Sequence, residues 1–174
     1  MLEQQVIEPA CSPWASNVVL VRKKDGTSRC CIDYRQINNV NVKDAYSLPK
    51  VNDSLDSMAG AEYFSTFDIR SSYHQVTVVE EDRDKTALIC PKGMFRFKGM
   101  PFGLCNEGAT FQRLMDLVLS GLNLEICLVY LDDIISKTIE ERFERLTMAF
   151  HRLADAGLKL KPEQCTLLQK SVKL

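Results

Sequence analysis

The sequence predicts an α+β fold in which antiparallel hairpins alternate with amphipathic helices. Two observations carry this prediction. Short apolar or β-branched stretches flank turn residues such as Asp25-Gly26 and Pro91-Lys92-Gly93, a pattern typical of hairpins. Between the hairpins, apolar residues recur at the i, i+3, i+4 and i+7 spacing of one helix face. A chain of 174 residues can bury one core, or two small lobes that share one.

The N-terminal third predicts a hairpin followed by a short helix. Residues 18–21 and 30–32 form the two strands, and the basic residues of the hairpin fall near the turn at Asp25-Gly26. Pro49 begins a helix whose apolar residues share one face, and Gly60 can end it.

The middle of the chain predicts a strand and a second hairpin. Residues 63–69 are rich in aromatic and β-branched side chains, which indicates a strand that ends near Asp68. We expect residues 75–79 to continue the sheet after a bend, and the acidic residues 80–84 to form a solvated connector. Residues 86–97 then form the hairpin, which also carries basic side chains.

The C-terminal half predicts two longer helices separated by a hairpin. Asn106 can cap the first helix, which ends at Gly121. Residues 126–131 form an apolar strand that runs into Asp132-Asp133 and then returns. A capping box, Thr138-x-x-Glu141, begins the second helix, which stops at Gly157 and leads to a last strand.

Composition bounds the classes of function. The net charge of -1 and pI near 6.1 leave no global basic footprint of the kind nucleic-acid-binding proteins show, so such binding must rest on local patches. One candidate patch is Arg22-Lys23-Lys24 with Arg29, and a second is Lys92, Arg96 and Lys98. Solvated turns are the alternative interpretation of both.

Seven cysteines form no C-x-x-C pair, so we expect reduced, mostly packed thiols rather than a zinc site. No apolar run reaches the ~20 residues of a membrane span, and the N-terminus lacks the layout of a signal peptide. The expectation is an intracellular protein that is neither secreted nor membrane-bound.

Three aspartates stand where carboxylates are costly. Asp132 and Asp133 interrupt an apolar pair of strands, and Asp68 falls near the end of another strand. Successive strand residues point to opposite faces, so adjacent aspartates approach one site only where the strand turns. Three acids at strand ends make a hard-oxygen site suited to Mg²⁺ or Mn²⁺. An acid-rich surface turn and a satisfied strand-end cap are the structural alternatives.

Seven segments, which make up four motifs in the expected order, resemble the reverse transcriptases of gypsy-type long-terminal-repeat retroelements over nearly the whole chain. They are Ser12-Pro13-Trp14-Ala15-Ser16, Val21-Arg22-Lys23-Lys24-Asp25-Gly26, Cys31-Ile32-Asp33-Tyr34-Arg35-Gln36-Ile37-Asn38, Phe67-Asp68-Ile69-Arg70-Ser71-Ser72-Tyr73-His74-Gln75, Met100-Pro101-Phe102-Gly103-Leu104-Cys105-Asn106, Ala109-Thr110-Phe111-Gln112 and Tyr130-Leu131-Asp132-Asp133. The resemblance implies RNA-directed DNA polymerase activity, in which two Mg²⁺ or Mn²⁺ ions serve the addition of deoxynucleotides to a primer.

The resemblance also implies roles for individual residues. The catalytic and metal-binding acids would be Asp68, Asp132 and Asp133. Tyr73 would crowd a ribose 2′-oxygen and so favour deoxynucleotides. The other implied contacts are Lys23, Arg29, Phe102 and Gly103 with the nucleotide, and Leu131, Gln112 and Arg113 with the primer or template.

A right-hand polymerase fold follows from the same resemblance, with an antiparallel palm sheet backed by helices. Residues 1–60 and 80–99 would be the fingers, and 61–79 and 100–174 the palm. The implied partners are an RNA or DNA template-primer and the remainder of a Pol polyprotein, including the thumb, ribonuclease H and integrase. The implied location of the protein is the cytoplasm or a retroelement particle.

Two departures bear on activity. Family members usually carry two more apolar residues between Ile135 and Ser136, and their absence shortens the returning strand by ~6.6 Å. The sequence also stops at Leu174, before the family's primer-gripping strands and thumb, which indicates a polyprotein fragment or a degenerate remnant. A catalytically inactive remnant with weak nucleic-acid binding therefore stays open beside the polymerase, as does a metal-dependent nuclease or phosphatase.

Overall fold

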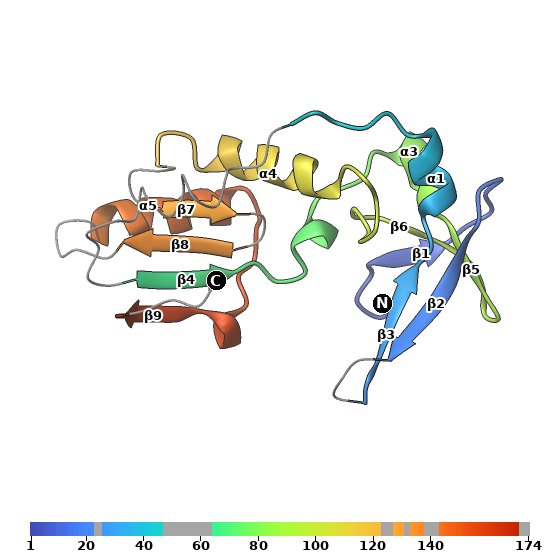
Figure 1. Cartoon of the computed structure of the whole chain (residues 1–174), viewed down its shortest axis with the longest axis horizontal. Coiled ribbons are helices and arrows are strands. Elements are labelled where there is room, and N and C mark those ends of the chain that lie inside the picture. The colour runs from blue at the N-terminus through green and yellow to red at the C-terminus, as the bar shows by residue number, and fades with distance from the viewer. Residues whose placement is uncertain (23–25, 47–63, 123–126, 131–132, 138–142, 171–174) are drawn as a thin grey trace. The chain divides into compact units, whose positions relative to one another are not determined.

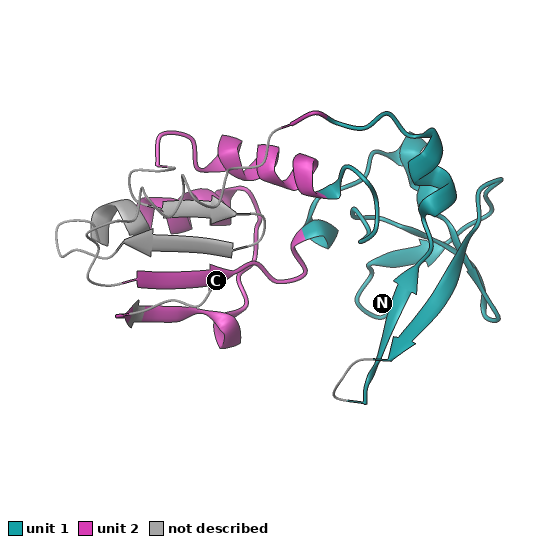
Figure 2. Ribbon diagram, in the orientation of Figure 1, with its two compact units in different colours: residues 1–44, 73–107 teal, residues 45–72, 108–174 magenta. Residues whose placement is uncertain are grey.

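The computed structural model describes residues 1–22, 26–46, 64–122, 127–130, 133–137 and 143–170, and leaves the side chains of 127–130, 133–137, 143–146 and Leu168 undescribed. The chain folds into two compact units (Figure 2). Unit 1 comprises residues 1–44 and 73–107, and unit 2 comprises 45–72 and 108–174. These divisions differ from the lobe boundaries expected from the sequence, and the names fingers and palm remain a proposal.

Unit 1 is built on a five-stranded sheet in the order β1-β6-β5-β2-β3 (Figure 1). Its strands are β1 Ile7–Pro9, β2 Ser16–Arg22, β3 Ser28–Ile32, β5 Leu88–Cys90 and β6 Gly93–Phe97. All pairs are antiparallel except β2 with β5. Both hairpins predicted from the sequence, β2-β3 and β5-β6, are confirmed.

The core of unit 1 forms where β5 and β6 pack with residues of β1, β2 and β3. The short helix α1 (Arg35–Val40) follows β3. Leu88, Phe95 and Phe97 are buried together. Tyr34, which precedes α1, is 2% exposed, and its hydroxyl donates a 2.8 Å hydrogen bond to the carbonyl oxygen of Thr86. This bond satisfies two buried polar groups that would otherwise lose their hydration.

The connector predicted at residues 80–84 is helical instead, with α3 at Glu80–Arg83 and a 3₁₀ turn, η2, at Asp84–Thr86. Acidic residues in the first turn of α3 favour this because they complement the helix dipole. Arg96 forms ion pairs with three acids: Glu80 of α3, Asp84 of η2 at 2.9 Å and Glu8 of β1 at 2.8 Å. The second predicted basic patch is therefore wrong at Arg96, whose charge is compensated within unit 1.

The strand predicted at residues 75–79 is also wrong. The segment begins as a 3₁₀ helix, η1, at Ser72–Gln75, preceded by Ser71 with a φ of 48°. It then meets the end of β6 through an isolated bridge between Thr77 and Gly99. An ideal Cβ at Gly99 would lie 2.0 Å from the carbonyl oxygen of His74, so only glycine permits this approach.

Unit 2 is built on a four-stranded antiparallel sheet in the order β7-β8-β4-β9 (Figure 1). Its strands are β4 Phe64–Asp68, β7 Cys127–Tyr130, β8 Asp133–Lys137 and β9 Thr166–Gln169. The sequence predicted a strand ending near Asp68, a hairpin with Asp132-Asp133 at its tip, and a last strand. The three elements are confirmed, except that Asp133 is already the first residue of β8, paired with Tyr130.

The described part of unit 2 also contains α4 Glu107–Val118, whose first residue belongs to unit 1, α5 Phe143–Asp155 and the 3₁₀ turn η4 Pro162–Gln164. The ring of Phe150 packs edge-on against Phe67 of β4 at 4.9 Å, which places α5 against the sheet. Gly157, with a φ of 73°, ends α5, and the amide of Leu158 returns to the carbonyl of Leu153. The predicted helix stop at Gly157 is confirmed.

Four further sequence predictions concern a helix, a capping box, the cysteines and membrane spans. The helix expected from Pro49 to Gly60 and the capping box at Thr138 lie outside the described residues. The expectation of mostly packed thiols is wrong for the six cysteines described, because three are exposed, three are half-buried and none is buried. Among the described residues, no helix has the length and apolar composition needed to cross a membrane.

Candidate active site

Asp68, the first predicted catalytic acid, is the last residue of β4 in unit 2. Its carbonyl oxygen accepts a 2.9 Å hydrogen bond from the amide of Lys161, and the next residue, Ile69, bridges to Leu160. Ile69 is 1% exposed, whereas Asp68 is half-buried. The alternation of the strand thus seats Ile69 in the core while the neighbouring carboxylate keeps contact with solvent.

Asp133, the first residue of β8, is the backbone partner of Asp68 in the antiparallel ladder. Residues directly opposite in such a ladder have Cα atoms about 4.5–5.5 Å apart. The tertiary fold thus brings together two residues that are 65 positions apart in the sequence. Asp132 and Leu131 lie outside the described residues, and no cluster of three or more potential metal ligands occurs in the part of the chain that is described.

Three of the predicted nucleotide-binding residues, all in unit 1, line a pocket of about 370 Å³. Arg29 of β3, Phe102 and Gly103 all line it, while Lys23 lies outside the described residues. The guanidinium of Arg29 lies over the ring of Phe102 at 5.7 Å, within the range of a cation-π contact. The pocket therefore combines one exposed cation with one partly exposed aromatic ring.

Tyr73, the predicted sugar-contacting residue, supports this pocket from below the surface. It is 8% exposed and packs edge-on against Phe102 with ring centroids 5.0 Å apart. His74 packs against the same ring at 5.2 Å and stacks on Phe97. The orientation of Phe102 is thus set by two aromatic neighbours that follow each other in the chain.

Two ionisable side chains of this pocket have shifted pKa values. Burial holds the pKa of His74 below its usual 6.5, only partly offset by the hydrogen-bonding carbonyl of Met100. Burial raises the pKa of Glu107, although backbone amides of Gly103 and Leu104 and the charge of Arg29 act in the opposite direction. Desolvation is therefore the largest influence on the pKa of both His74 and Glu107.

Sequence reasoning missed several lining residues of this pocket, including Cys30, Cys31, His74 and Glu107. Position next to a predicted residue or motif marks three of them, Cys30, Cys31 and Glu107, as candidates. Cys30 and Cys31 directly follow Arg29, and Glu107 follows the Met100–Asn106 motif at the first position of a helix. Neither signal indicated which side chains would share a pocket, because that depends on how β3 and the 101–106 segment approach each other.

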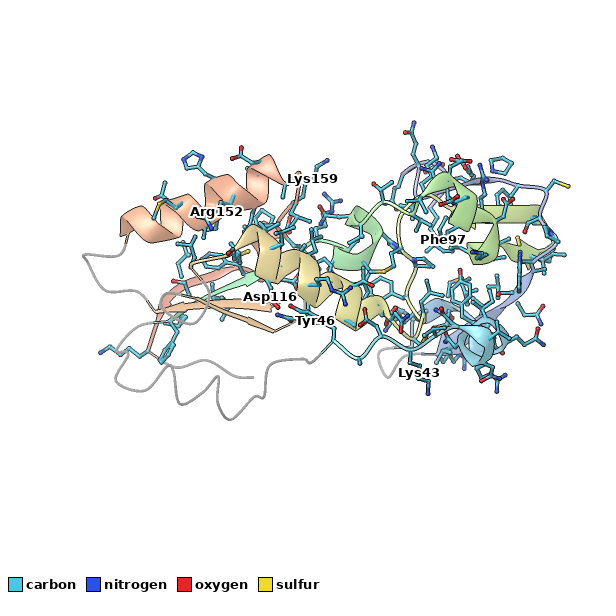
Figure 3. The ribbon with its side chains drawn as sticks, turned by 90° about the horizontal axis from the view of Figure 1, so that it is seen from above. Lys43, Tyr46, Phe97, Asp116, Arg152 and Lys159 are labelled. Atoms are coloured by element: carbon cyan, nitrogen blue, oxygen red, sulfur yellow. The ribbon has the colours of Figure 1, made fainter. Side chains whose placement is uncertain are left out.

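Gln112 and Arg113, the residues predicted to support the template side, lie on α4 of unit 2. Gln112 is completely buried, and its amide donates to Asp116 at 3.1 Å, so its side chain is not on the surface of the unit. Asp116 also accepts a 2.6 Å hydrogen bond from the hydroxyl of Tyr46 (Figure 3). The guanidinium of the exposed Arg113 lies over the ring of Tyr46 at 4.6 Å. Only Arg113 of this pair is accessible to a ligand.

Comparison with known sequences gives a consistent picture. The family model described as reverse transcriptase (RNA-dependent DNA polymerase) matches residues 21–174. The Pol polyprotein of transposon 297 from Drosophila melanogaster is 39% identical over 98% of this chain. That of transposon gypsy, from the same organism, is 32% identical over 99% of it, and an enzymatic polyprotein of cauliflower mosaic virus is also 32% identical over 99%. The chain spans 17% of each Drosophila relative and 26% of the viral one.

Solved structures with the same fold include the protease-reverse transcriptase of a foamy virus in complex with an RNA/DNA hybrid. Its TM-score is 0.89 at 23% identity, and the match covers 99% of this chain and 23% of that one. The native protease-reverse transcriptase of prototype foamy virus gives a TM-score of 0.87 at 24% identity, covering 99% and 23%. The α+β, reverse-transcriptase-like fold expected from the sequence is confirmed.

Proposed function

This chain belongs to the family of reverse transcriptases (RNA-dependent DNA polymerases), and we propose that it is the module of a gypsy-type Pol polyprotein that adds deoxynucleotides to a primer. The observation that carries the proposal is the register between β4 and β8, which pairs Asp68 with Asp133. Residues directly opposite in an antiparallel pair project to the same face of the sheet. Two carboxylates in that relation repel each other unless a cation lies between them.

In the proposed reaction, the 3′-oxygen of the primer attacks the α-phosphorus of the deoxynucleoside triphosphate. A phosphodiester bond forms, the bond to the β-phosphate breaks, pyrophosphate leaves and the hydroxyl proton passes to solvent. Asp68, Asp132 and Asp133 would hold two Mg²⁺ or Mn²⁺ ions, with Asp68 and Asp132 as the principal ligands, since hard carboxylate oxygens suit these cations. When bound, such ions activate the attacking oxygen and neutralise the leaving phosphates.

Unit 1 would supply the nucleotide-binding part of the reaction. Arg29 is exposed at the pocket, and its guanidinium can donate paired hydrogen bonds to phosphate oxygens while it stays over Phe102. Lys23 would add a second cation. Tyr73 packs under Phe102, and we propose that these rings set the floor on which the sugar rests, leaving too little room for a ribose 2′-hydroxyl.

Primer extension tests the proposal. Labelled oligo(dT) annealed to poly(rA) is incubated with the chain, dTTP and Mg²⁺, and elongated primer is measured. We expect Asp68→Asn and Asp133→Asn to slow extension by roughly 100-fold or more, because each loses several kcal/mol of charge stabilisation. Asp155→Asn, at the exposed end of α5, is the matched control and should extend at the wild-type rate.

Extension by Asp68→Asn at the wild-type rate would refute the mechanism. A wild-type chain that binds primer-template with salt-dependent affinity, yet extends no primer, would identify the inactive remnant instead. Release of free phosphate or nicked strands, rather than pyrophosphate, would indicate a hydrolase that uses the same acids.

A further inference from the structure

The segment between β6 and α4, residues 101–106, is tied to α1 and to the segment after it by two asparagine side chains. Asn38 donates from Nδ2 to the carbonyl oxygen of Gly103 at 2.8 Å and accepts at Oδ1 from the amide of Cys105 at 2.8 Å. In return, Asn106 donates from Nδ2 to the carbonyl oxygen of Val42 at 2.9 Å and accepts at Oδ1 from the amide of Asp44 at 3.0 Å. Four hydrogen bonds thus join segments more than 60 residues apart in the sequence.

A third side chain holds the same segment from its other end. Oε2 of Glu107, the first residue of α4, accepts a 2.6 Å hydrogen bond from the amide of Gly103. Both polar groups of Gly103 are therefore bound by side chains, the carbonyl by Asn38 and the amide by Glu107. Gly103 also has a φ of 100°, which favours glycine, so its backbone conformation is held rather than freely sampled.

This clamp lies beside the predicted nucleotide-binding residues. Gly103 lines the pocket, and its neighbour Phe102 carries the ring that contacts Arg29 and Tyr73. Outside regular secondary structure, the segment lacks ladder or helix hydrogen bonds, so these side-chain bonds help to hold its backbone in place. Asn38 donates one hydrogen bond to Gly103 and accepts one from Cys105. A side chain that lacks either the donor or the acceptor therefore cannot replace it fully.

We propose that Asn38 and Glu107 are positioning residues that hold Phe102 and Gly103 where the incoming nucleotide binds, and so set the affinity for deoxynucleotides. The inference rests on the proposed polymerase function and adds two residues that act through the backbone of Gly103, one of which, Glu107, also lines the pocket. Displacement of binding groups by about 1 Å can cost on the order of 100-fold in rate, so loss of one of several bonds should give a smaller effect.

Steady-state extension of oligo(dT) on poly(rA), with dTTP varied, separates KM from kcat. Asn38→Asp keeps the acceptor for Cys105 but replaces the donor to Gly103 by a carboxylate, and we expect the KM for dTTP to rise roughly tenfold. Asn39→Asp is the matched control, because Asn39 is the next residue of α1, is exposed, and has no side-chain hydrogen bond among the described residues. It makes the same change of charge and should leave KM unchanged.

Glu107 gives a second, independent pair of variants. Glu107→Ala removes the acceptor for Gly103 and should raise the KM for dTTP in the same way. Glu107→Gln keeps a side-chain carbonyl that can accept this bond while removing the charge near Arg29, so its KM should stay within about threefold of the wild-type value. Faster hydrogen exchange of the Gly103 amide in Glu107→Ala, but not in Glu107→Gln, would show directly that the clamp has opened.

The outcomes separate the inference from the function on which it rests. An active wild-type chain whose KM is unchanged in both Asn38→Asp and Glu107→Ala would overturn the inference alone, as would a fall in kcat and thermal stability without a change in KM. A wild-type chain that extends no primer would overturn the proposed function and this inference with it. If one of the two variants fails to fold, the other decides.

Discussion

Replacement of Gly99 by alanine tests how closely the segment after η1 approaches the end of β6. The added Cβ would lie 2.0 Å from the carbonyl oxygen and 2.8 Å from the carbonyl carbon of His74, whereas real Cβ atoms stay beyond 3.0 Å. Both obstructing atoms belong to the backbone, so no side-chain rotation relieves the clash. The two segments must separate by about 1 Å.

The cost follows from the hydrogen bonds that flank this contact. The amide of Met100 donates to Val76 at 2.8 Å, and that of Val78 donates to Lys98 at 2.9 Å. A separation of about 1 Å takes both bonds beyond the usual 3.2 Å limit. Two lost bonds, at about 1 kcal/mol each, together with residual strain give a destabilisation of about 2–3 kcal/mol.

Urea unfolding followed by tryptophan fluorescence measures this change. Trp14 is the single tryptophan of the chain and lies in unit 1, as Gly99 does. With a denaturant dependence of roughly 2 kcal/mol per molar urea, the unfolding midpoint should fall by about 1 M. Gly26→Ala is the control: its Cβ meets nothing within 4 Å, and only its φ of 83° should cost about 1 kcal/mol. A midpoint for Gly99→Ala equal to that of the control would refute the reasoning.

The same fluorescence assay checks two further predictions. Tyr34→Phe removes the buried 2.8 Å bond to Thr86 and should lower the stability of unit 1 by about 1–2 kcal/mol; an unchanged midpoint would contradict the role of that bond. His74 has a pKa below 6.5 in the folded state, so the unfolded state binds more protons, and its contribution to stability should be lost as pH falls below 6.5. His74→Gln should therefore show a smaller loss of stability than the wild type between about pH 7.5 and pH 5.5, and an equal loss would exclude His74 as the cause.

The local structure of this protein was largely predictable from its sequence. The turn residues around Gly26 and Gly93 located both hairpins of unit 1, and the apolar stripe ending at Gly157 located the end of α5. These signals succeed because chirality, turn geometry and side-chain period act over a few neighbouring residues. Where residues 75–79 were expected to form a strand, the close approach at Gly99 and the turn at Ser71 prevailed over local composition.

The candidate site was predictable by residue type but not by arrangement. The positions of Asp68, Arg29 and Phe102 within sequence motifs were enough to select them. The burial of Gln112 was not predicted, because polar side chains are ordinarily at the surface and the bond that satisfies its amide depends on Asp116, one turn further along α4. Likewise, the sequence places Arg96 in a basic patch, but in the folded protein its charge is compensated by ion pairs with Glu8 and Asp84.

By itself, then, the sequence determined the family, the α+β class and the three acids on which the proposed chemistry depends. Only the tertiary structure decided that Asp68 pairs with Asp133, that Arg96 is neutralised, and that Asn38 holds Gly103. The physical reason is that periodicity fixes which face of an element a side chain occupies, whereas its partner on that face is set by strand register and packing between segments distant in the chain.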